Sequence, residues 1–263
     1  MRRGRLHTAS AHCRLSRLPV ADLEALGVNG PSHRRKMSDR LVDAVHNIVM
    51  KDLMSKVFVN IGLSLDGYMA PEGMTMHDPH FKNWGAKWGE MMAWILKQQY
   101  FREEVLKLGP GGEVGAVNDL VRNTFERIGA NIMGKRMFDQ GEIAWPEEAP
   151  FHTPVYVLTH ERRAPWVRPG GTTFHFINDG PERALAMARE AAGRRDIRIS
   201  GGADVVQQYM KLGAVDELEI ALAPALFGSG RRLFENLQEP TPQFRIESVL
   251  HGSDATHLRY VRR

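Results

Sequence analysis

Three short stretches of the sequence place glycine, cationic or hydroxyl residues where an apolar run ends, and such positions suit the binding of phosphate groups. The residues concerned are Gly134, Lys135, Arg136, Thr159, His160, Gly201 and Gly202. A helix that starts after such a run offers unpaired N–H donors and about half a positive charge at its N-terminus. Glycine has no Cβ, so phosphate oxygens can approach the main chain, while Lys and Arg add charge. The chemistry indicated is anion binding.

Each stretch taken alone has a simpler interpretation. Gly201 and Gly202 can form a plain turn, and Lys135 and Arg136 can be two solvated side chains. The spacing matches neither the dinucleotide-binding pattern G-x-G-x-x-G nor the P-loop. Three phosphate-compatible strand ends in one sheet nevertheless favour a dinucleotide that carries an additional phosphate.

The residues around these stretches alternate between strand and helix patterns. Strands are expected at 56–64, 130–134, 154–160, 173–177, 196–200, 216–226, 243–250 and 256–262, and helices at 88–108, 116–128, 181–193 and 203–213. This alternation indicates an α/β domain with a mainly parallel sheet, and the last two strands indicate an antiparallel edge hairpin. Ligands bind beyond the carboxyl ends of parallel strands, so the three stretches are expected to lie together.

Four segments in order resemble one family. "VNIGLSLDGYMA", "IMGKRMF", "VYVLTH" and "IRISGGADVVQQYMKLGAVDELEIALAPALFGSGRRLF" are similar to the dihydrofolate-reductase-like proteins that include the reductase domain of bacterial riboflavin biosynthesis, the RibD C-terminal domain. The resemblance covers about Lys56 to Arg263. It implies a three-layer dihydrofolate-reductase-like fold, a homodimer, and NADPH-dependent hydride transfer to a small pterin-like, pyrimidine-like or flavin-precursor-like heterocycle. A cytoplasmic location is also predicted, with which the lone thiol of Cys13 is compatible.

The resemblance also implies roles for the cofactor-binding residues. The pyrophosphate of NADPH would lie against Gly201, Gly202, Ala203 and Asp204. The adenosine ribose and its 2′-phosphate would lie against Gly134, Lys135, Arg136, Thr159 and His160. The basic residues among these favour NADPH over NADH.

Ser64, Asp66 and Trp145 are the residues expected near the substrate. The resemblance places Ser64 and Asp66 beside the nicotinamide, where Asp66 would be the proton source or a hydrogen-bond partner of an amino-pyrimidine or pterin ring. The alternative is that Asp66 only forms the turn of an Asp-Gly dipeptide. Trp145 either lines the substrate pocket or ends a loop.

The sequence differs from true dihydrofolate reductases at one acidic residue, and two functions other than reduction by NADPH stay open. The acid found on a helix of true dihydrofolate reductases has no clear match, because Glu103 and Glu104 look like a solvated helix face. Hydride transfer mainly needs two aligned rings, so this difference argues against folate as the substrate more than against reduction. The alternatives are a nucleotide-binding sensor or resistance protein without turnover, and a flavin-binding oxidoreductase.

Residues 74–94 form a His- and Trp-rich region outside the shared pattern. His77, Asp78 and His80 could form a two-His-one-carboxylate metal set, but with no fourth ligand evident a lid is favoured and no metal site is predicted. The tryptophans of the region either cap a flat substrate or form a small hydrophobic cluster. "FGSGRR" at 227–232 is expected to be a tight turn.

Residues 1–54 differ in charge from the rest of the chain. They hold ten Lys or Arg against five acidic residues, a net charge of +5, whereas the whole chain carries +4 and residues 55–263 therefore carry −1. We predict a basic leader at 1–54, either disordered, a targeting segment or the result of a start codon upstream of Met54, and one domain at 55–263. The basic charge does not lie on the predicted domain, so no nucleic-acid partner is indicated.

Two further properties of the sequence restrict the protein's class. The single cysteine, Cys13, excludes an intramolecular disulfide and a cysteine metal cluster. No window approaches the roughly 18 apolar residues that span a bilayer, so no membrane segment is predicted.

Overall fold

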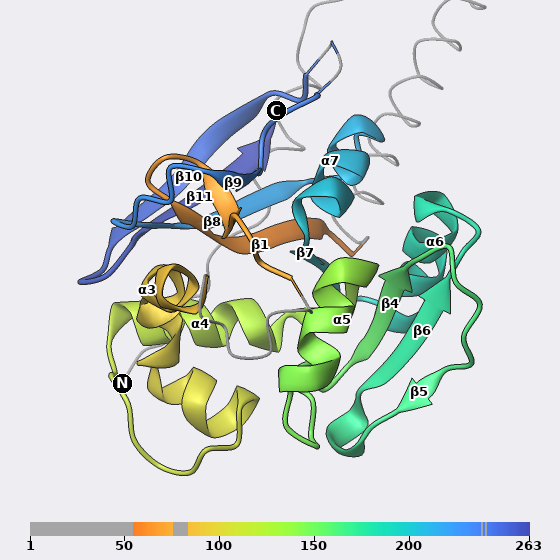
Figure 1. The fold of residues 1–263 in the computed structure, drawn as a ribbon, viewed down its shortest axis with the longest axis horizontal. Coiled ribbons are helices and arrows are strands. Elements are labelled where there is room, and N and C mark those ends of the chain that lie inside the picture. Colours follow the sequence, from red (N-terminus) through yellow and green to blue (C-terminus); the bar gives the residue numbers. More distant parts are fainter. Residues whose placement is uncertain (1–54, 76–83, 238, 240) are drawn as a thin grey trace, which may run out of the picture. The chain divides into compact units, whose positions relative to one another are not determined.

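The computed structural model describes residues 55–75, 84–237, 239 and 241–263 (Figure 1). Ser55–Arg263 forms one compact unit, and this unit is the one described here. The predicted leader and the possible metal set of His77, Asp78 and His80 lie outside the described residues.

A nine-stranded sheet forms the centre of this unit, in the order β10-β11-β8-β1-β7-β3-β4-β6-β5. The strands are β1 (Val57–Ser64), β3 (Ile128–Gly134), β4 (Pro154–Leu158), β5 (Trp166–Val167), β6 (Thr173–Ile177), β7 (Asp196–Gly201), β8 (Glu217–Ala223), β10 (Phe244–His251) and β11 (Thr256–Arg262). The six strands from β8 to β6 are parallel to one another, whereas β10, β11 and β5 are antiparallel to their neighbours. The predicted fold class, a mainly parallel sheet with an antiparallel edge hairpin, is confirmed.

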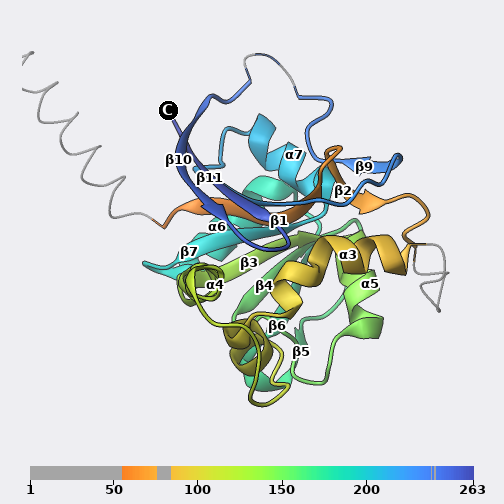
Figure 2. The same cartoon turned by 90° about the vertical axis from the view of Figure 1, so that its left-hand side faces the viewer.

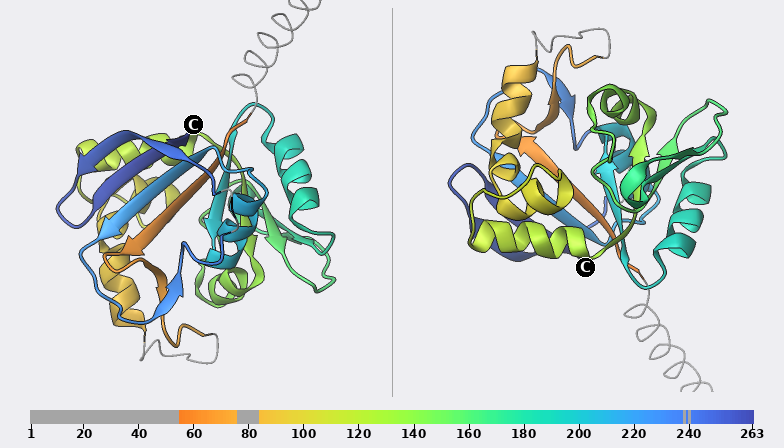
Figure 3. Two further views of the ribbon diagram at one scale, coloured as in Figure 1. Left: turned by 90° about the horizontal axis from the view of Figure 1, so that it is seen from above. Right: turned by 90° about the horizontal axis from the view of Figure 1, so that it is seen from below.

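Helices cover both faces of the sheet (Figures 2 and 3). They are α3 (Gly85–Leu96), α4 (Ala116–Glu126), α5 (Lys135–Ala144), α6 (Pro181–Ala192) and α7 (Ala203–Lys211), with short helical turns at Phe101–Val105 and Pro169–Gly171. Successive strand residues point to opposite faces, so Val57, Val59 and Ile61 of β1 join α6 and α7 in the largest apolar cluster. Helices α3, α4 and α5 lie on the other face (Figure 2). No helix of the described residues is long and apolar enough to cross a membrane.

The single helix predicted at 88–108 is wrong, because the structure interrupts it. Helix α3 ends at Leu96, and a separate π-helical turn follows at Phe101–Val105. Between them Gln99 N–H donates to the Glu113 carbonyl (2.9 Å), and Glu113 N–H donates to the Lys97 carbonyl (2.7 Å). Only a glycine fits at 112, where a Cβ would lie 2.7 Å from the Gln99 Cα. A segment distant in sequence thus takes the backbone groups that would have continued the helix.

A second, two-stranded sheet was not predicted. Strand β2 (Tyr68–Pro71) pairs antiparallel with β9 (Gly230–Arg232), which lies in the segment 227–232 that was expected to be a tight turn. Gly230 adopts a φ of +143°, and a Cβ there would lie 2.1 Å from the Ala70 carbonyl oxygen. The glycine therefore permits the close approach of two segments that lie far apart in the sequence.

Candidate functional site

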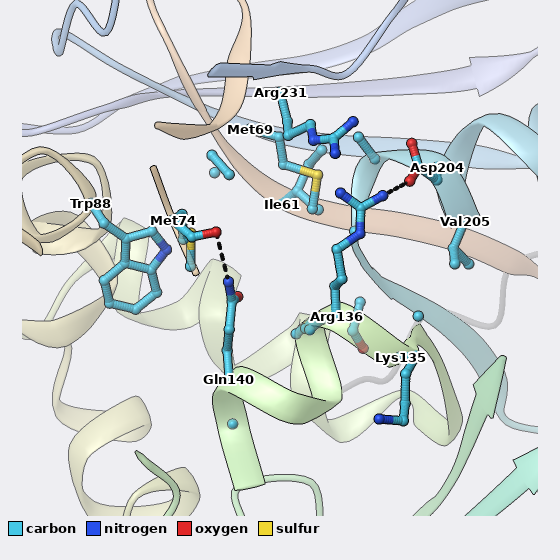
Figure 4. Close-up of a pocket in the computed structure, with 18 of the residues that line it drawn as sticks. Ile61, Met69, Met74, Trp88, Lys135, Arg136, Gln140, Asp204, Val205 and Arg231 are labelled. Carbon is cyan, nitrogen blue, oxygen red and sulfur yellow. Dashed lines mark hydrogen bonds and ion pairs between the residues drawn. The ribbon is translucent and has the colours of Figure 1, made fainter. Parts of the chain in front are cut away.

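A cleft of about 2020 Å³ opens at the carboxyl edge of the parallel strands. Figure 4 shows Trp88 of α3 on one side and Arg136 and Gln140 of α5 on the other. Eight of the nine predicted cofactor-binding residues line this cleft: Gly134, Lys135, Arg136, Thr159, His160, Gly202, Ala203 and Asp204. The volume exceeds the roughly 300–1,000 Å³ of an ordinary small-ligand pocket, so the cleft has room for a dinucleotide and a second molecule.

The two glycine corners adjoin each other at the cleft. A Cβ placed on Gly134 would lie 2.9 Å from Val205 Cγ2 and 3.8 Å from the Gly202 nitrogen. Gly201 does not line the cleft, and its φ of +126° together with a Cβ position 2.5 Å from Met69 Cε gives it a turn-forming role. Gly202 has no atom within 4 Å of its Cβ position, so its bare face opens into the cleft.

Two helices begin at this place with their first N–H groups available. Gly134 is the N-cap of α5 and Gly202 the N-cap of α7, and neither helix has a side-chain cap hydrogen bond. The first four N–H groups of a helix have no partner within the helix, and the helix dipole makes them attractive to an anion. The cleft therefore has two adjacent helix N-termini suited to phosphate oxygens.

The predicted cations beside these helices are already in ion pairs. Lys135 Nζ lies 2.6 Å from Asp139 Oδ1 and 3.3 Å from Glu161 Oε1. Desolvation lowers the pKa of Lys135, but the hydrogen bonds to Asp139 and Glu161 outweigh it and raise the pKa. Arg136 pairs with Asp204 across the cleft, from α5 to α7 (Figure 4). The Arg136 and Asp204 side chains are 61% and 53% exposed, and exposed pairs contribute about 0–1 kcal/mol, so a phosphate can displace Asp204 at small cost.

The end of β4 supplies the third predicted stretch. The Thr159 N–H donates to the Ile177 carbonyl (3.0 Å), and the Thr159 hydroxyl oxygen accepts from the Glu161 N–H (3.0 Å). The hydroxyl proton of Thr159 therefore stays available as a donor. His160 follows on the exposed surface and also lines the cleft.

The structure places Asp66 and Ser64 outside the cleft lining. Asp66 Oδ2 accepts from the N–H groups of Gly228 (2.7 Å) and Phe227 (3.1 Å), and Oδ1 accepts from the Ser64 hydroxyl (2.6 Å). Partial desolvation raises the pKa of Asp66, yet the hydrogen bonds from Ser64, Gly228 and Phe227 outweigh it and lower the pKa to about 2. A carboxylate that is ionised and saturated at neutral pH donates no proton. This geometry favours the turn-forming interpretation of Asp66.

Replacing Asp66 by asparagine is expected to reduce the free energy of unfolding by about 1–2 kcal/mol at neutral pH. The amide loses the charge that strengthens the bonds from Phe227 and Gly228, and it presents an N–H group to one of these donors. Because the folded-state pKa of about 2 lies below the usual 3.8, this stability is present above about pH 4 and is lost as the pH falls through about 2.

Urea denaturation at neutral and acidic pH measures the Asp66 effect. The control is Asp179→Asn, which changes an exposed aspartate and is expected to leave the stability unchanged. An Asp66→Asn protein as stable as the wild type at neutral pH contradicts the role assigned here.

Trp145 belongs mainly to an aromatic cluster, although it also lines the cleft. Its ring stacks on Phe174, with centroids 5.3 Å apart and an interplanar angle of 6°, and meets Phe151 edge to face. A Cβ on Gly141 would lie 2.0 Å from Trp145 Cζ2, so this glycine makes space for the indole. Trp145 thus forms a rigid part of the cleft wall.

Helix α3 forms the opposite, apolar wall. Trp88, Met91 and Met92 of this helix line the cleft and pack in one small hydrophobic cluster, and Trp94 packs in a second. At the rim, Gln140 of α5 donates to the Met74 carbonyl (3.4 Å) across the cleft opening (Figure 4). The tryptophans of α3 therefore combine both sequence interpretations: they form a hydrophobic cluster, and part of it faces the cleft.

The floor of the cleft contains polar side chains that the sequence analysis missed. Asn60 of β1 and Arg198 and Ser200 of β7 line it. Their signal in the sequence is a polar residue at every second position of a strand buried between helix layers, where parallel strands are usually apolar on both faces. Among the described residues, no group of three or more His, Cys, Asp or Glu is arranged to hold a metal ion.

Comparison with known proteins places this geometry in a family. The model of the RibD C-terminal domain matches residues 55–258. The chain is 21% identical to a protein from Shewanella sp. PV-4 described as a candidate riboflavin biosynthesis protein, whose crystal structure superposes with a TM-score of 0.55 over 80% of this chain and 99% of that chain. At this identity the likeness shows the fold alone.

Two Bacillus subtilis (strain 168) proteins, both uncharacterized, match shorter segments. YwjB is 37% identical over 87 residues, which is 33% of this chain and 49% of YwjB. YyaP is 26% identical over 85 residues, 32% of this chain and 45% of YyaP. The chain thus spans about half the length of the curated relatives it matches. The family match at 55–258, by contrast, covers the central sheet except for the last residues of β11, and the chain belongs to the RibD C-terminal domain family.

Proposed function

We propose that the unit at 55–263 is an NADPH-dependent reductase that transfers a hydride to a small heterocycle of the pterin, pyrimidine or flavin-precursor type. The observation that carries this proposal is the meeting of three strand ends in one cleft. Eight residues from the ends of β3, β4 and β7, predicted as the binding site of one dinucleotide, line it together. Membership of the RibD C-terminal domain family supports reduction as the chemistry.

The residues fit NADPH on physical grounds. The open face of Gly202 and the uncapped starts of α5 and α7 suit a pyrophosphate, with donors from the main chain of Ala203 and Asp204. Arg136, with Lys135 and the side chains at the end of β4, suits the 2′-phosphate, because arginine forms paired hydrogen bonds with phosphate. When bound, NADPH supplies the hydride, and these residues hold it in place.

The remaining cleft suits a flat substrate beside the nicotinamide. Trp88 and the methionines of α3 form an apolar wall that excludes water, while Asn60, Arg198 and Ser200 supply polar groups on the floor. A mostly apolar site with a few polar groups fixes the orientation of a ring. Since the cofactor carries the redox chemistry, the protein's contribution is to align two rings and keep out water.

Titration with NADPH tests the proposal, and Arg136→Gln tests the assignment of the 2′-phosphate. Wild-type protein is expected to bind NADPH at micromolar concentrations. Loss of one charge-assisted hydrogen bond costs about 1.5–3 kcal/mol, so Arg136→Gln is expected to weaken NADPH binding about tenfold or more while changing NADH binding less than about twofold. Quenching of intrinsic fluorescence or calorimetry measures both dissociation constants.

Arg183→Gln is the matched control. Arg183 is also an exposed arginine near the start of a helix that follows a strand, but it does not line the cleft. The variant is expected to bind both nucleotides like the wild type. If wild-type protein gives no signal with NADPH, the proposed function fails. If Arg136→Gln weakens NADPH and NADH equally, only the 2′-phosphate assignment fails.

A panel of pterins, pyrimidines and flavins then tests turnover, through loss of the absorbance of reduced nicotinamide. Oxidation of NADPH with any of them supports the reductase, whereas binding without oxidation favours a sensor. The cytoplasmic location stays a prediction. So does the homodimer, for which the outer strand β10 offers exposed apolar side chains at Ile246 and Val249.

A further inference from the structure

The two faces of the central sheet differ in polarity. The face covered by α6 and α7 is apolar, whereas the other carries Asn60, Asn131, Arg198 and Ser200 at its centre. The Ser200 hydroxyl donates to Asn131 Oδ1 (2.9 Å), and the Asn131 amide donates to the Thr153 hydroxyl (2.8 Å). Ser200, Asn131 and Thr153 therefore form hydrogen bonds with one another. Arg198 differs from them because most of its hydrogen-bond donors have no acceptor among the residues that the structure describes.

The Arg198 guanidinium lacks an acidic partner among the described residues. Within the described part of the chain, one hydrogen bond runs from an Nη2–H to the Asn60 carbonyl at 3.4 Å, and the Nε is buried with no partner. The ring of Phe125 lies 5.0 Å from Arg198 Cζ, which gives a cation–π contact but no acceptor. A guanidinium has five N–H donors, so most of them have no acceptor in this part of the protein.

The carboxylate of Glu219, whose charge acts on Arg198, is hydrogen-bonded to other residues. Glu219 Oε1 accepts from Arg127 Nη2 (2.8 Å), and Glu219 Oε2 accepts from the Thr124 hydroxyl (3.0 Å) and the Asn60 amide (3.2 Å). Desolvation lowers the pKa of Arg198 to about 10, and Glu219 opposes this only in part. At neutral pH the guanidinium therefore keeps its charge.

Keeping the Arg198 guanidinium charged without hydrogen-bond acceptors costs free energy unless a bound molecule supplies the acceptors. Arg198 is partly buried and its Nε fully so, and a charge that is desolvated without a partner costs free energy, so proteins seldom keep one in a strand at the centre of a sheet. Arg198 lines the same cleft as the apolar residues of α3 and Gly202, which follows β7. Its free donors are therefore placed to bind a molecule in the cleft.

We propose that Arg198 binds a singly charged, planar oxyanion, of which a carboxylate is the type, carried by the heterocycle that this cleft reduces. A planar guanidinium matches a carboxylate with two parallel hydrogen bonds. The one positive charge of Arg198 suits one negative charge better than a phosphate ester, which carries about −1.5 to −2 at neutral pH. The inference deepens the proposed function and rests on it for the identity of the acceptor as the reduced molecule.

A pair of pyrimidines that differ by one carboxylate tests this inference: orotate, which is uracil-6-carboxylate, and uracil. Calorimetry is carried out on the full chain with and without NADPH. Wild-type protein is expected to bind orotate at least about tenfold more tightly than uracil, because a charge-assisted hydrogen bond contributes about 1.5–3 kcal/mol. Arg198→Met is expected to remove this preference and to leave NADPH binding within about twofold, since the methionine changes neither helix start.

Two further variants separate the role of Arg198 from general effects. Arg198→Lys keeps the charge without the planar fork and is expected to keep part of the preference for orotate. Arg122→Met removes an exposed arginine that contacts the Tyr100 ring outside the cleft, and it is expected to behave like the wild type. Arg198→Met is also expected to unfold at the same temperature as the wild type or at a higher one, because it removes an uncompensated charge.

The results distinguish failure of the carboxylate site at Arg198 from failure of the proposed reductase function. The inference is overturned if wild-type protein shows no preference for orotate, including the case in which neither compound binds, or if Arg198→Met keeps the preference. If the protein prefers orotate but does not bind NADPH, the anion site is supported and the proposed function is contradicted.

Discussion

Replacing Glu217 by glutamine is expected to lower the free energy of unfolding by about 3 kcal/mol at neutral pH. The Glu217 side chain is 2% exposed, at the amino end of the sheet, and its carboxylate is shared by Lys56 Nζ (2.9 Å), Arg127 Nη1 (2.9 Å) and Arg259 Nη2 (2.8 Å). Breaking a buried ion pair by removing one partner costs about 3–5 kcal/mol. The lower value applies because the cations are partly exposed and because Arg127 retains its ion pairs with Asp196 and Glu219.

The effect of Glu217→Gln is expected to depend on pH with a definite sign. Burial raises the pKa of Glu217, but the hydrogen bond from Lys56 and the charges of Arg127 and Arg259 outweigh it and lower the pKa to about 2. A folded-state value below the usual 4.5 means that the stabilisation is fully present above about pH 4.5 and is lost as the pH falls towards 2.

Urea denaturation over a pH series measures this prediction. Glu247→Gln is the matched control, because Glu247 forms an exposed pair with Arg245 and should change stability by less than about 1 kcal/mol. Equal effects of the two substitutions at neutral pH, or an effect of Glu217→Gln that grows in acid, would contradict the assigned network.

Replacing Gly202 by valine is expected to weaken NADPH binding about a hundredfold with little loss of stability. Gly202 has φ −76° and ψ −170°, an extended conformation open to any residue, and its Cβ position has no neighbour within 4 Å. The new side chain would occupy the space in which pyrophosphate oxygens approach the start of α7. Losing two charge-assisted hydrogen bonds costs about 3 kcal/mol or more, which corresponds to about a hundredfold in affinity.

Gly89→Val provides the comparison for Gly202. Gly89 also lines the cleft and also has no atom within 4 Å of its Cβ position, but it lies on α3 in the other half. This variant is expected to bind NADPH like the wild type. Circular dichroism and thermal unfolding check that both variants are folded. Normal NADPH affinity in a folded Gly202→Val protein would place the pyrophosphate elsewhere.

The parallel sheet could be predicted because its signals are local. "KVFVNIGLS" and "DIRIS" are short and rich in β-branched residues, and the structure has β1 and β7 at these positions. Glycine at the end of a strand is equally visible in sequence. Once the sheet is parallel, its topology alone brings Gly134 and Gly202 to one edge.

The features that were missed depend on contacts between distant segments. The interruption after Leu96 is made by Glu113, and β2 exists only because Gly230 admits a strand from the far end of the chain. Helical periodicity cannot report either contact. The same holds for Asp66, whose Asp-Gly dipeptide is visible in sequence while its partners Phe227 and Gly228 are not.

The electrostatics of the site were the least predictable part. Lys135 and Arg136 could be recognised as cations, but their pairing with Asp139 and Asp204 follows from helix packing. Arg198 shows the opposite case. Its importance comes from having no acid beside it in the described residues, which only the sheet order and the positions of the neighbouring carboxylates reveal.

The position of β1 has a consequence for biosynthesis. Val57, Phe58 and Val59 are fully buried between β7 and β8, where Val57 pairs with Ile197 and Phe58 with Glu217. The ribosome synthesises this apolar strand early in the domain, and it synthesises the two neighbouring strands only near the end. During most of translation the nascent polypeptide therefore contains an apolar strand without its partners. Such long-range pairing slows folding, and we expect expression yield to respond to chaperone supply more strongly than the stability of the finished protein suggests.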